Sequence, residues 1–229
     1  MMRACIFEWS RVWEVAMSQS RTEQLAPLTG VAFFVLLLAG ALLINNYEYL
    51  PPVSELQGFF TDNATRLQVA GYLGVASAAF LIWFAGSVRH SLRPHEGGTG
   101  RLSAVAFGGG VASGALVALA FSVLFVGAAR GGNEGGITAD AAGVFYDLYG
   151  TVVGSALPVA MAVLIGATAV VAFRTRAWPA WLAWAGAVLA LGSLSPISYI
   201  FIGIDLLWVL VVSILLYTRG RAEVPAAAE

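Results

Sequence analysis

The sequence predicts an all-α fold, a polytopic membrane bundle of six transmembrane helices with both termini in the cytoplasm. The 229 residues are 59% hydrophobic and only 11% charged, and the mean hydropathy is +0.81. A typical soluble domain is about 45–50% apolar and about 25% charged, so this chain has too few charges to cover a water-soluble globule. With a net charge of −1 as well, the composition excludes a soluble enzyme, a disordered linker and a nucleic-acid binder.

The six predicted spans are runs of mostly apolar residues near the roughly 20 residues that cross a bilayer. Proline ends a helix, so Ser195–Pro196 separates the last two runs. A single helix over 178–217 would be about 60 Å long, about twice a bilayer core. The predicted spans are Ala26–Asn46, Gln68–Val88, Leu102–Ala129, Val144–Phe173, the short Trp178–Leu194, and Tyr199–Tyr217.

The arginines predict the orientation. All 12 basic residues are arginine, and ten of them fall on the side that the two termini share. These ten are Arg3, Arg11, Arg21, Arg89, Arg93, Arg101, Arg174, Arg176, Arg219 and Arg221, whereas Arg66 and Arg130 fall on the other side. Positive residues concentrate in cytoplasmic loops, so both termini are predicted to be cytoplasmic. The use of arginine alone, with abundant Ala, Gly and Val, indicates a GC-rich bacterial genome and hence the bacterial inner (cytoplasmic) membrane.

Three parts of the chain follow: an N-terminal segment 1–25, the transmembrane domain 26–217 and a short cytoplasmic tail 218–229. Segment 1–25 lacks the apolar run of a secretory signal. Two interpretations stay open for it. Its apolar residues share one helical arc, which is typical of an amphipathic helix in the headgroup region. Alternatively, Met17 is the true start and the residues before it are a start-site artefact.

The polar loops give two further expectations. In the outer loop 47–67, Val53, Leu56, Phe59 and Phe60 have helical spacing after two prolines, and Ser54 with Gln57 resembles a capping box. We expect a short amphipathic helix that caps the bundle, and a lid is the less favoured alternative. The cytoplasmic loop 89–101 is basic, which suits an orientation-setting loop better than a site for anionic lipid or phosphate.

Asp205 is the main candidate for chemistry, because it falls inside the last span. A carboxylate at mid-bilayer costs roughly 2.5–3.5 kcal/mol on insertion scales, so it must face the bundle interior, be protonated or find a donor. One interpretation is a proton or cation site. The other is an interhelical hydrogen bond, for instance to Tyr146, Tyr149 or Ser198.

Other polar residues are predicted near the same membrane face. Tyr146, Asp147 and Tyr149 open the fourth span, where aromatic residues of the interfacial belt and an acid near a helix N-terminus are both expected. Asn45 and Asn46 close the first span on that side. If the helices were neighbours, these residues and Asp205 would form an outward-facing polar cluster.

Small residues predict where helices pack. Gly110 and Gly114 in the third span, and Gly150 and Gly154 in the fourth, have the spacing that lets backbones approach closely. We expect them to pack spans three and four together. Pro158 is expected to kink the fourth span.

The sequence predicts no metal site and no cofactor. Both histidines lie in a loop, no Lys or Arg lies within a span, and the single cysteine, Cys5, excludes a cysteine-ligated cluster. The motifs of intramembrane metalloproteases and of serine hydrolases do not occur. Three tryptophans, Trp83, Trp184 and Trp208, could line a site for a lipid-soluble ligand, although membrane tryptophans usually anchor or pack.

Three stretches resemble a six-helix actinobacterial membrane family known as domain of unknown function 4386. They are GTGRLSAVAFGGGVA at Gly98–Ala112, RTRAWPAWLAWAG at Arg174–Gly186, and LWVLVVSILL at Leu207–Leu216. The resemblance covers about residues 26–217 and implies a six-helix fold. It implies no activity and transfers no functional residue.

Three functions are therefore considered. The favoured one is a membrane protein without a catalytic site, a scaffold or accessory subunit that contacts the bilayer and either other membrane subunits or further copies of itself. The second is a small proton-coupled permease that uses Asp205. The third is a quinone-, lipid- or pigment-binding subunit.

Overall fold

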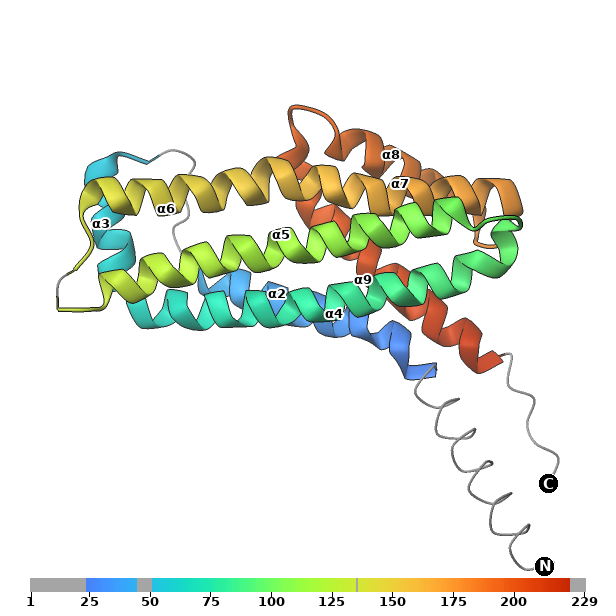
Figure 1. The fold of residues 1–229 in the computed structure, drawn as a ribbon, viewed down its shortest axis with the longest axis horizontal. Helices are drawn as coiled ribbons and strands as arrows, with labels where there is room; N and C mark the ends of the chain where they lie inside the picture. Colours follow the sequence, from blue (N-terminus) through green and yellow to red (C-terminus); the bar gives the residue numbers. More distant parts are fainter. Residues whose placement is uncertain (1–23, 45–50, 135, 223–229) are drawn as a thin grey trace, which may run out of the picture.

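The computed structural model describes residues 24–44, 51–134 and 136–222, and in these ranges all regular structure is helical. The predicted segment 1–25 and the residues Asn45 and Asn46 lie largely or wholly outside them. The elements, shown in Figure 1, are η1 (Ala26–Leu28), α2 (Thr29–Leu43), α3 (Val53–Asp62), α4 (Ala64–Glu96), α5 (Arg101–Gly131), α6 (Ala139–Thr151), η2 (Val152–Ala156), α7 (Leu157–Thr175), α8 (Ala180–Ser193) and α9 (Ser198–Ala222).

The helices are those of an integral membrane bundle. Among the described residues, five helical stretches are long and apolar enough to cross a bilayer: 26–43, 64–96, 101–131, 139–175 and 198–219. The predicted fifth span corresponds to α8, which has only 14 residues between Pro179 and the turn at Pro196. The helical membrane fold is thus confirmed, while the count of six spans and the cytoplasmic side of the termini stay predictions.

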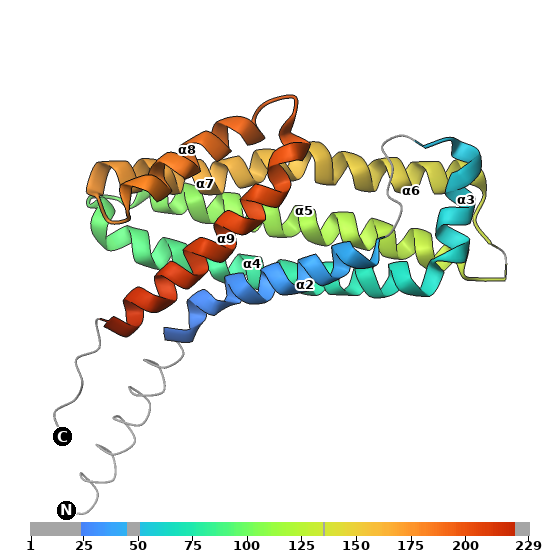
Figure 2. The ribbon, with the colours of Figure 1, turned by 180° about the vertical axis from the view of Figure 1, so that it is seen from behind.

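Three long helical rods form the centre of the bundle. α4, α5 and the continuous α6–η2–α7 lie side by side, with α5 in contact with both of the others. Figure 2 shows that α2 lies along α4, α8 lies along α7, and α9 crosses the bundle obliquely over α2 and α7. The start of α2 and the end of α9 lie at the same end, where the Ser213 hydroxyl donates to the carbonyl of Pro27.

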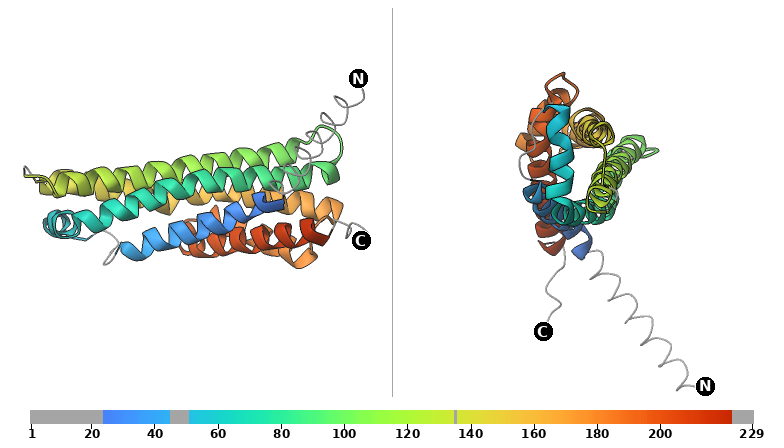
Figure 3. Two further views of the ribbon diagram at one scale, coloured as in Figure 1. Left: turned by 90° about the horizontal axis from the view of Figure 1, so that it is seen from below. Right: turned by 90° about the vertical axis from the view of Figure 1, so that its left-hand side faces the viewer.

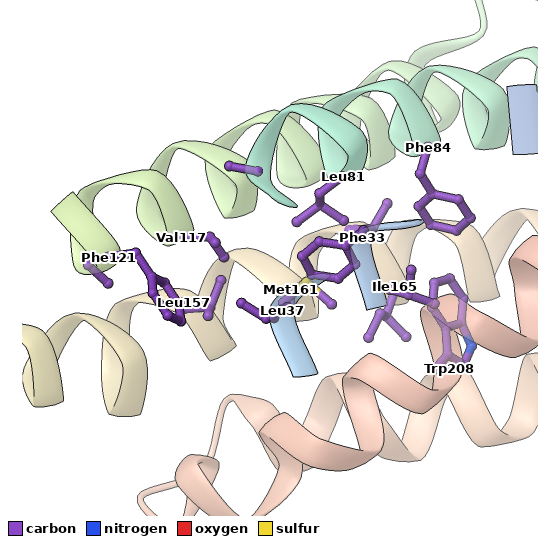
Figure 4. Close-up of a cluster of buried hydrophobic side chains, with 14 of the residues drawn as sticks. Phe33, Leu37, Leu81, Phe84, Val117, Phe121, Leu157, Met161, Ile165 and Trp208 are labelled. Atoms are coloured by element: carbon purple, nitrogen blue, oxygen red, sulfur yellow. The ribbon is translucent and has the colours of Figure 1, made fainter. Parts of the chain in front are cut away.

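The core between these helices is packed with large apolar side chains. Phe33, Phe84 and Ile165 are at most 1% exposed, and Figure 4 shows them meeting from different helices. On the outside, Trp83 and Leu191 are each 72% exposed. Apolar side chains on the outer face suit contact with lipid rather than water.

Glycines set the closest helix contacts, but not between the helices that we expected. A Cβ at Gly110 would lie 2.3 Å from Cβ of Ala85, and one at Gly114 would lie 2.7 Å from Ile82, so both glycines pack α5 mainly against α4. The expectation that they join spans three and four was wrong. Gly109 makes that contact, because its Cβ would lie 2.5 Å from the backbone nitrogen of Leu164 in α7.

The second glycine pair behaves differently. Gly150 lies half-buried in α6. A Cβ at Gly154 would meet no atom within 4 Å, so this glycine does not permit a close helix contact.

The two ends of the bundle differ in charge. Because α4 and α5 are antiparallel, Arg93 and Arg101 lie together at one end, which also holds the end of α7 and the end of α9. We call this the arginine-rich end.

Asp147, on the outer surface of α6, is 27 residues from Arg174, or about 40 Å along a helix. Because a bilayer core is about 30 Å thick, Asp147 lies beyond the apolar layer when Arg174 sits at its edge.

α3 closes the opposite end. The helix lies across the ends of the long rods (Figure 3), with Leu56 and Phe60 buried and Phe60 held against Gly127 and Gly131 of α5. The predicted amphipathic packing helix is confirmed. The capping box was wrong, because Pro52 is the N-cap and no side chain caps the helix.

Candidate functional site: a buried aspartate beside a π-helical turn

Asp205 lies in α9 and is 1% exposed. Its Oδ2 accepts a hydrogen bond of 2.8 Å from the Ser193 hydroxyl. Its Oδ1 is buried and has no hydrogen-bond partner among the described residues. The aspartate therefore faces the protein, as expected, but its donor is Ser193 and not Tyr146, Tyr149 or Ser198.

A short turn brings Ser193 and Asp205 together. Ser193 is the last residue of α8, and Pro196 prevents the helix from continuing. Backbone bonds from Ser195 to Gly192 and from Ser198 to Ser195 close the turn, so that α9 returns along α8. Asp205 is seven residues into α9, about 10 Å from this turn.

The neighbouring rod is irregular at the same level. Pro158 has no N–H, so the carbonyl of Gly154, four residues earlier, loses its usual helical donor. The rod does not end at this point, because residues Val152–Ala156 form a π-helical turn that leads directly into α7. The Ser198 hydroxyl donates to the Gly154 carbonyl at 2.9 Å and so supplies a donor from α9. π-turns inside α-helices occur frequently at functional sites.

A small cavity of about 10 Å³ lies beside Asp205, about the room that one water molecule needs. Apart from the aspartate its lining is apolar and comes from α2, α5, α7 and α9. The lining residues are Phe33, Val117, Leu157, Pro158, Met161, Ile202, Asp205 and Leu206. A space of this size is at the lower limit for one water molecule and is too small for an organic substrate.

The other predicted polar residues that the structure describes, Tyr146, Asp147 and Tyr149, lie on α6. Tyr146 and Tyr149 are buried in α6, where their rings pack edge-on against Phe59 and Phe121 respectively. Asp147 is exposed on the outer side of the same helix. Among the described residues, the ring contacts of Tyr146 and Tyr149 are therefore with Phe59 and Phe121, while the hydroxyl that bonds to Asp205 comes from Ser193.

The three tryptophans also lie apart. Trp83 and Trp184 are 72% and 65% exposed, on α4 and α8. Trp208 is buried, tilted against Trp178 at 6.4 Å between ring centroids, and its Nε1 has no hydrogen-bond partner among the described residues. Two of these described tryptophans thus face outward and the third faces the core, which does not fit one common site for a lipid-soluble ligand.

Within the described ranges, no group of three His, Cys, Asp or Glu side chains is placed to hold a metal ion. Comparison of the chain with models of protein families, with curated proteins and with solved structures found no match.

Proposed function

We propose that this membrane protein is a small proton-coupled permease in which Asp205 binds the proton. The observation that carries the proposal is the buried, unpartnered Oδ1 of Asp205 beside the π-helical turn at Pro158. A buried carboxylate with one free oxygen is costly in its charged form, so the neutral, protonated form is the cheaper one to bury. Ionisable groups inside a membrane bundle usually mark proton or ion pathways.

The surroundings support a reversible proton site. One hydroxyl, from Ser193, holds the carboxyl group in place, while no cation neutralises it permanently among the described residues. The adjacent rod stays helical, but its regular hydrogen bonding is disturbed by the π-helical turn Val152–Ala156 beside Pro158, a feature that is frequent at functional sites. A change in the packing of α9 on this rod would alter access to Asp205.

Infrared spectroscopy tests the proton site first. We expect the purified full chain to show the C=O absorption of a buried protonated carboxylic acid at neutral pH, and we expect Asp205→Asn to lose it. Asp147→Asn is the matched control, because Asp147 is an exposed acid on α6. An unchanged band in Asp205→Asn would show that Asp205 is not the protonated acid, and the proposed proton site would be refuted.

Transport is tested in liposomes that enclose a pH-sensitive dye under an imposed pH gradient. Amino acids, organic acids, sugars and amines are added in turn. We expect one of these classes to drive proton movement with the wild type and with Asp147→Asn, but not with Asp205→Asn. Loss of the infrared band in Asp205→Asn without solute-driven proton movement by the wild type would refute the permease and leave Asp205 a structural group.

The second candidate is a scaffold or accessory subunit. Exposed apolar side chains at the end of the bundle that α3 closes favour this role. There Val53 of α3 is 51% exposed, and Val144 and Leu148 of α6, close in sequence to the exposed acid Asp147, are 65% and 44% exposed. Apolar side chains beyond the bilayer suit contact with another membrane subunit or another copy of the chain. Gentle extraction followed by native mass spectrometry tests it: co-purifying subunits favour the accessory role, and a chain without partners favours the permease.

The proposed setting is the bacterial cytoplasmic membrane with both termini in the cytoplasm, supported by the uneven distribution of arginine. Membership in the six-helix family of domain 4386 also stays a proposal, supported by the three stretches quoted above.

A further inference from the structure

The turn between α7 and α8 combines exposed arginines with exposed aromatic side chains. Arg174 and Arg176 are exposed, and Trp181 and Trp184 of α8 are 60% and 65% exposed. The Trp184 ring packs against Phe173 with 4.9 Å between ring centroids. We propose that this turn is a binding site for the headgroup of an anionic phospholipid, with the arginines on the phosphate and the aromatic rings along the acyl chains.

A third arginine joins the turn from α9. The guanidinium of Arg219 donates to the carbonyl of Ala177 at 2.5 Å, so its charge lies at the turn although it is 42 residues away in sequence. Asp205 is the sole acid of the sequence between Arg174 and Arg219, and it is buried. The turn therefore carries three positive charges with no exposed acid of its own.

The nearby acid cannot neutralise this cluster fully. Glu96 interacts electrostatically with Arg174, but its two carboxylate oxygens accept the backbone N–H groups of Leu102 and Ser103 at 2.6 and 2.8 Å. That carboxylate serves the N-terminus of α5. The three arginines of the turn are therefore left to attract an external anion.

The conformation of Arg176 is a separate observation. It follows the end of α7 with φ 53° and ψ 24°, the left-handed region, and it is the only non-glycine residue there in the described ranges. Glycine is the favoured residue at such a helix end, because any side chain is strained there. Two hydrogen bonds hold the turn. The Arg176 N–H donates to the Ala172 carbonyl, and the Ala177 N–H donates to Thr175 Oγ1. This conformation places an exposed, positively charged side chain at a position where glycine would be the least strained residue.

The aromatic part of the site continues along α8. Trp181, Trp184, Val188 and Leu191 are all at least 60% exposed and recur at helical spacing on one face. The two tryptophans are at the end of this stripe nearest the arginines, which is where interfacial tryptophans sit in membrane proteins. A phosphate at the arginines would thus place its acyl chains along the stripe, so the ligand is a lipid rather than a free anion.

Native mass spectrometry of the full chain in detergent tests the site, with phosphatidylglycerol and phosphatidylcholine of equal acyl length as probes. We expect phosphatidylglycerol to be retained preferentially, and the double variant Arg174→Gln/Arg176→Gln to weaken its binding about twenty-five-fold, at about fivefold for each arginine. The matched control, Arg66→Gln/Arg130→Gln, removes the same charge at the opposite end and should change binding less than about twofold. Equal loss in both double variants, or equal retention of the two lipids, would overturn the proposal.

Two further measurements separate a lipid site from a structural role and from a site for free phosphate. Arg176→Gly should raise the melting temperature, because it relieves the left-handed strain, and should still weaken phosphatidylglycerol binding about fivefold. Unchanged lipid binding in this more stable variant would refute a role for the Arg176 charge. Inorganic phosphate in large excess should not displace the lipid; complete displacement would show that the site recognises a free anion.

Discussion

The bond from Ser198 to the Gly154 carbonyl allows a sharp test of how the chain accommodates Pro158. If the proline leaves that carbonyl without a donor in its own rod, Ser198 is its substitute, at 2.9 Å and with Ser198 7% exposed. Ser198→Ala then leaves a poorly hydrated carbonyl without its side-chain donor. Side-chain hydrogen bonds inside membrane proteins contribute about 0.6 kcal/mol on average and up to about 1.7, and this one also satisfies a backbone group. We expect Ser198→Ala to lower the free energy of unfolding by about 1 kcal/mol.

Pro158→Ala changes that expectation, because an alanine at this position can donate its own N–H to the carbonyl of Gly154. In the Pro158→Ala background, Ser198→Ala should therefore have almost no effect, which gives a coupling free energy of about 1 kcal/mol, or about fivefold in the unfolding equilibrium constant. Reversible unfolding in mixed detergent micelles measures all four variants of this cycle.

The control for this cycle is Ser155→Ala. Ser155 is exposed and its hydroxyl bonds to Thr151 within its own helical rod, so its loss should have little effect in either background. If Ser198→Ala lowers stability equally with and without Pro158, the reasoning about the missing N–H is refuted.

The remaining predictions concern the packing and ends of α5. Gly109→Ala should lower the free energy of unfolding by about 1–3 kcal/mol, because the new methyl group would overlap the backbone at Leu164. Gly108→Ala should raise the free energy of unfolding by about 0.5–1 kcal/mol, because a Cβ at this neighbouring position meets open space. A thermal shift in detergent distinguishes them, and equal shifts would contradict the assigned packing. Glu96→Ala should lower the free energy of unfolding by about 1 kcal/mol, because the two N–H groups that Glu96 accepts at the start of α5 would lose their partner. Unfolding in detergent checks this as well, and an unchanged midpoint would argue against the cap.

The features that could be predicted from the sequence are those set by local composition. Apolar length predicts the helices, and the burial of Asp205 follows because a carboxylate inside a span cannot face lipid. The partner of that aspartate could not be predicted in the same way. Ser193 reaches it only because the turn at Pro196 brings the end of α8 back along α9, and the sequence does not specify the geometry of that turn.

The contacts of the glycines show the same limit. The spacing of Gly110 and Gly114 correctly predicts close helix packing, but which helix lies opposite depends on the order of the rods around α5. The neighbouring Gly109 points to α7 because successive residues on a helix are about 100° apart. The signal that was missed is the run of three glycines at 108–110, which offers close approach on two faces at once.

The unequal lengths of the helices have a consequence for the surrounding lipid. α8 is about 21 Å long, whereas α5 beside the same core is about 46 Å. On the α8 side the hydrophobic length of the protein is therefore shorter than an unperturbed hydrocarbon layer of about 30 Å. Either the bilayer becomes thinner there or lipid tails cover the tip of the α8–α9 turn. Leu194 and Ile197 at that tip are 59% and 50% exposed, and apolar side chains at this place suit contact with lipid tails. Helices of such unequal length favour an uneven bilayer thickness around the protein, and we expect lipids with short acyl chains to collect beside α8.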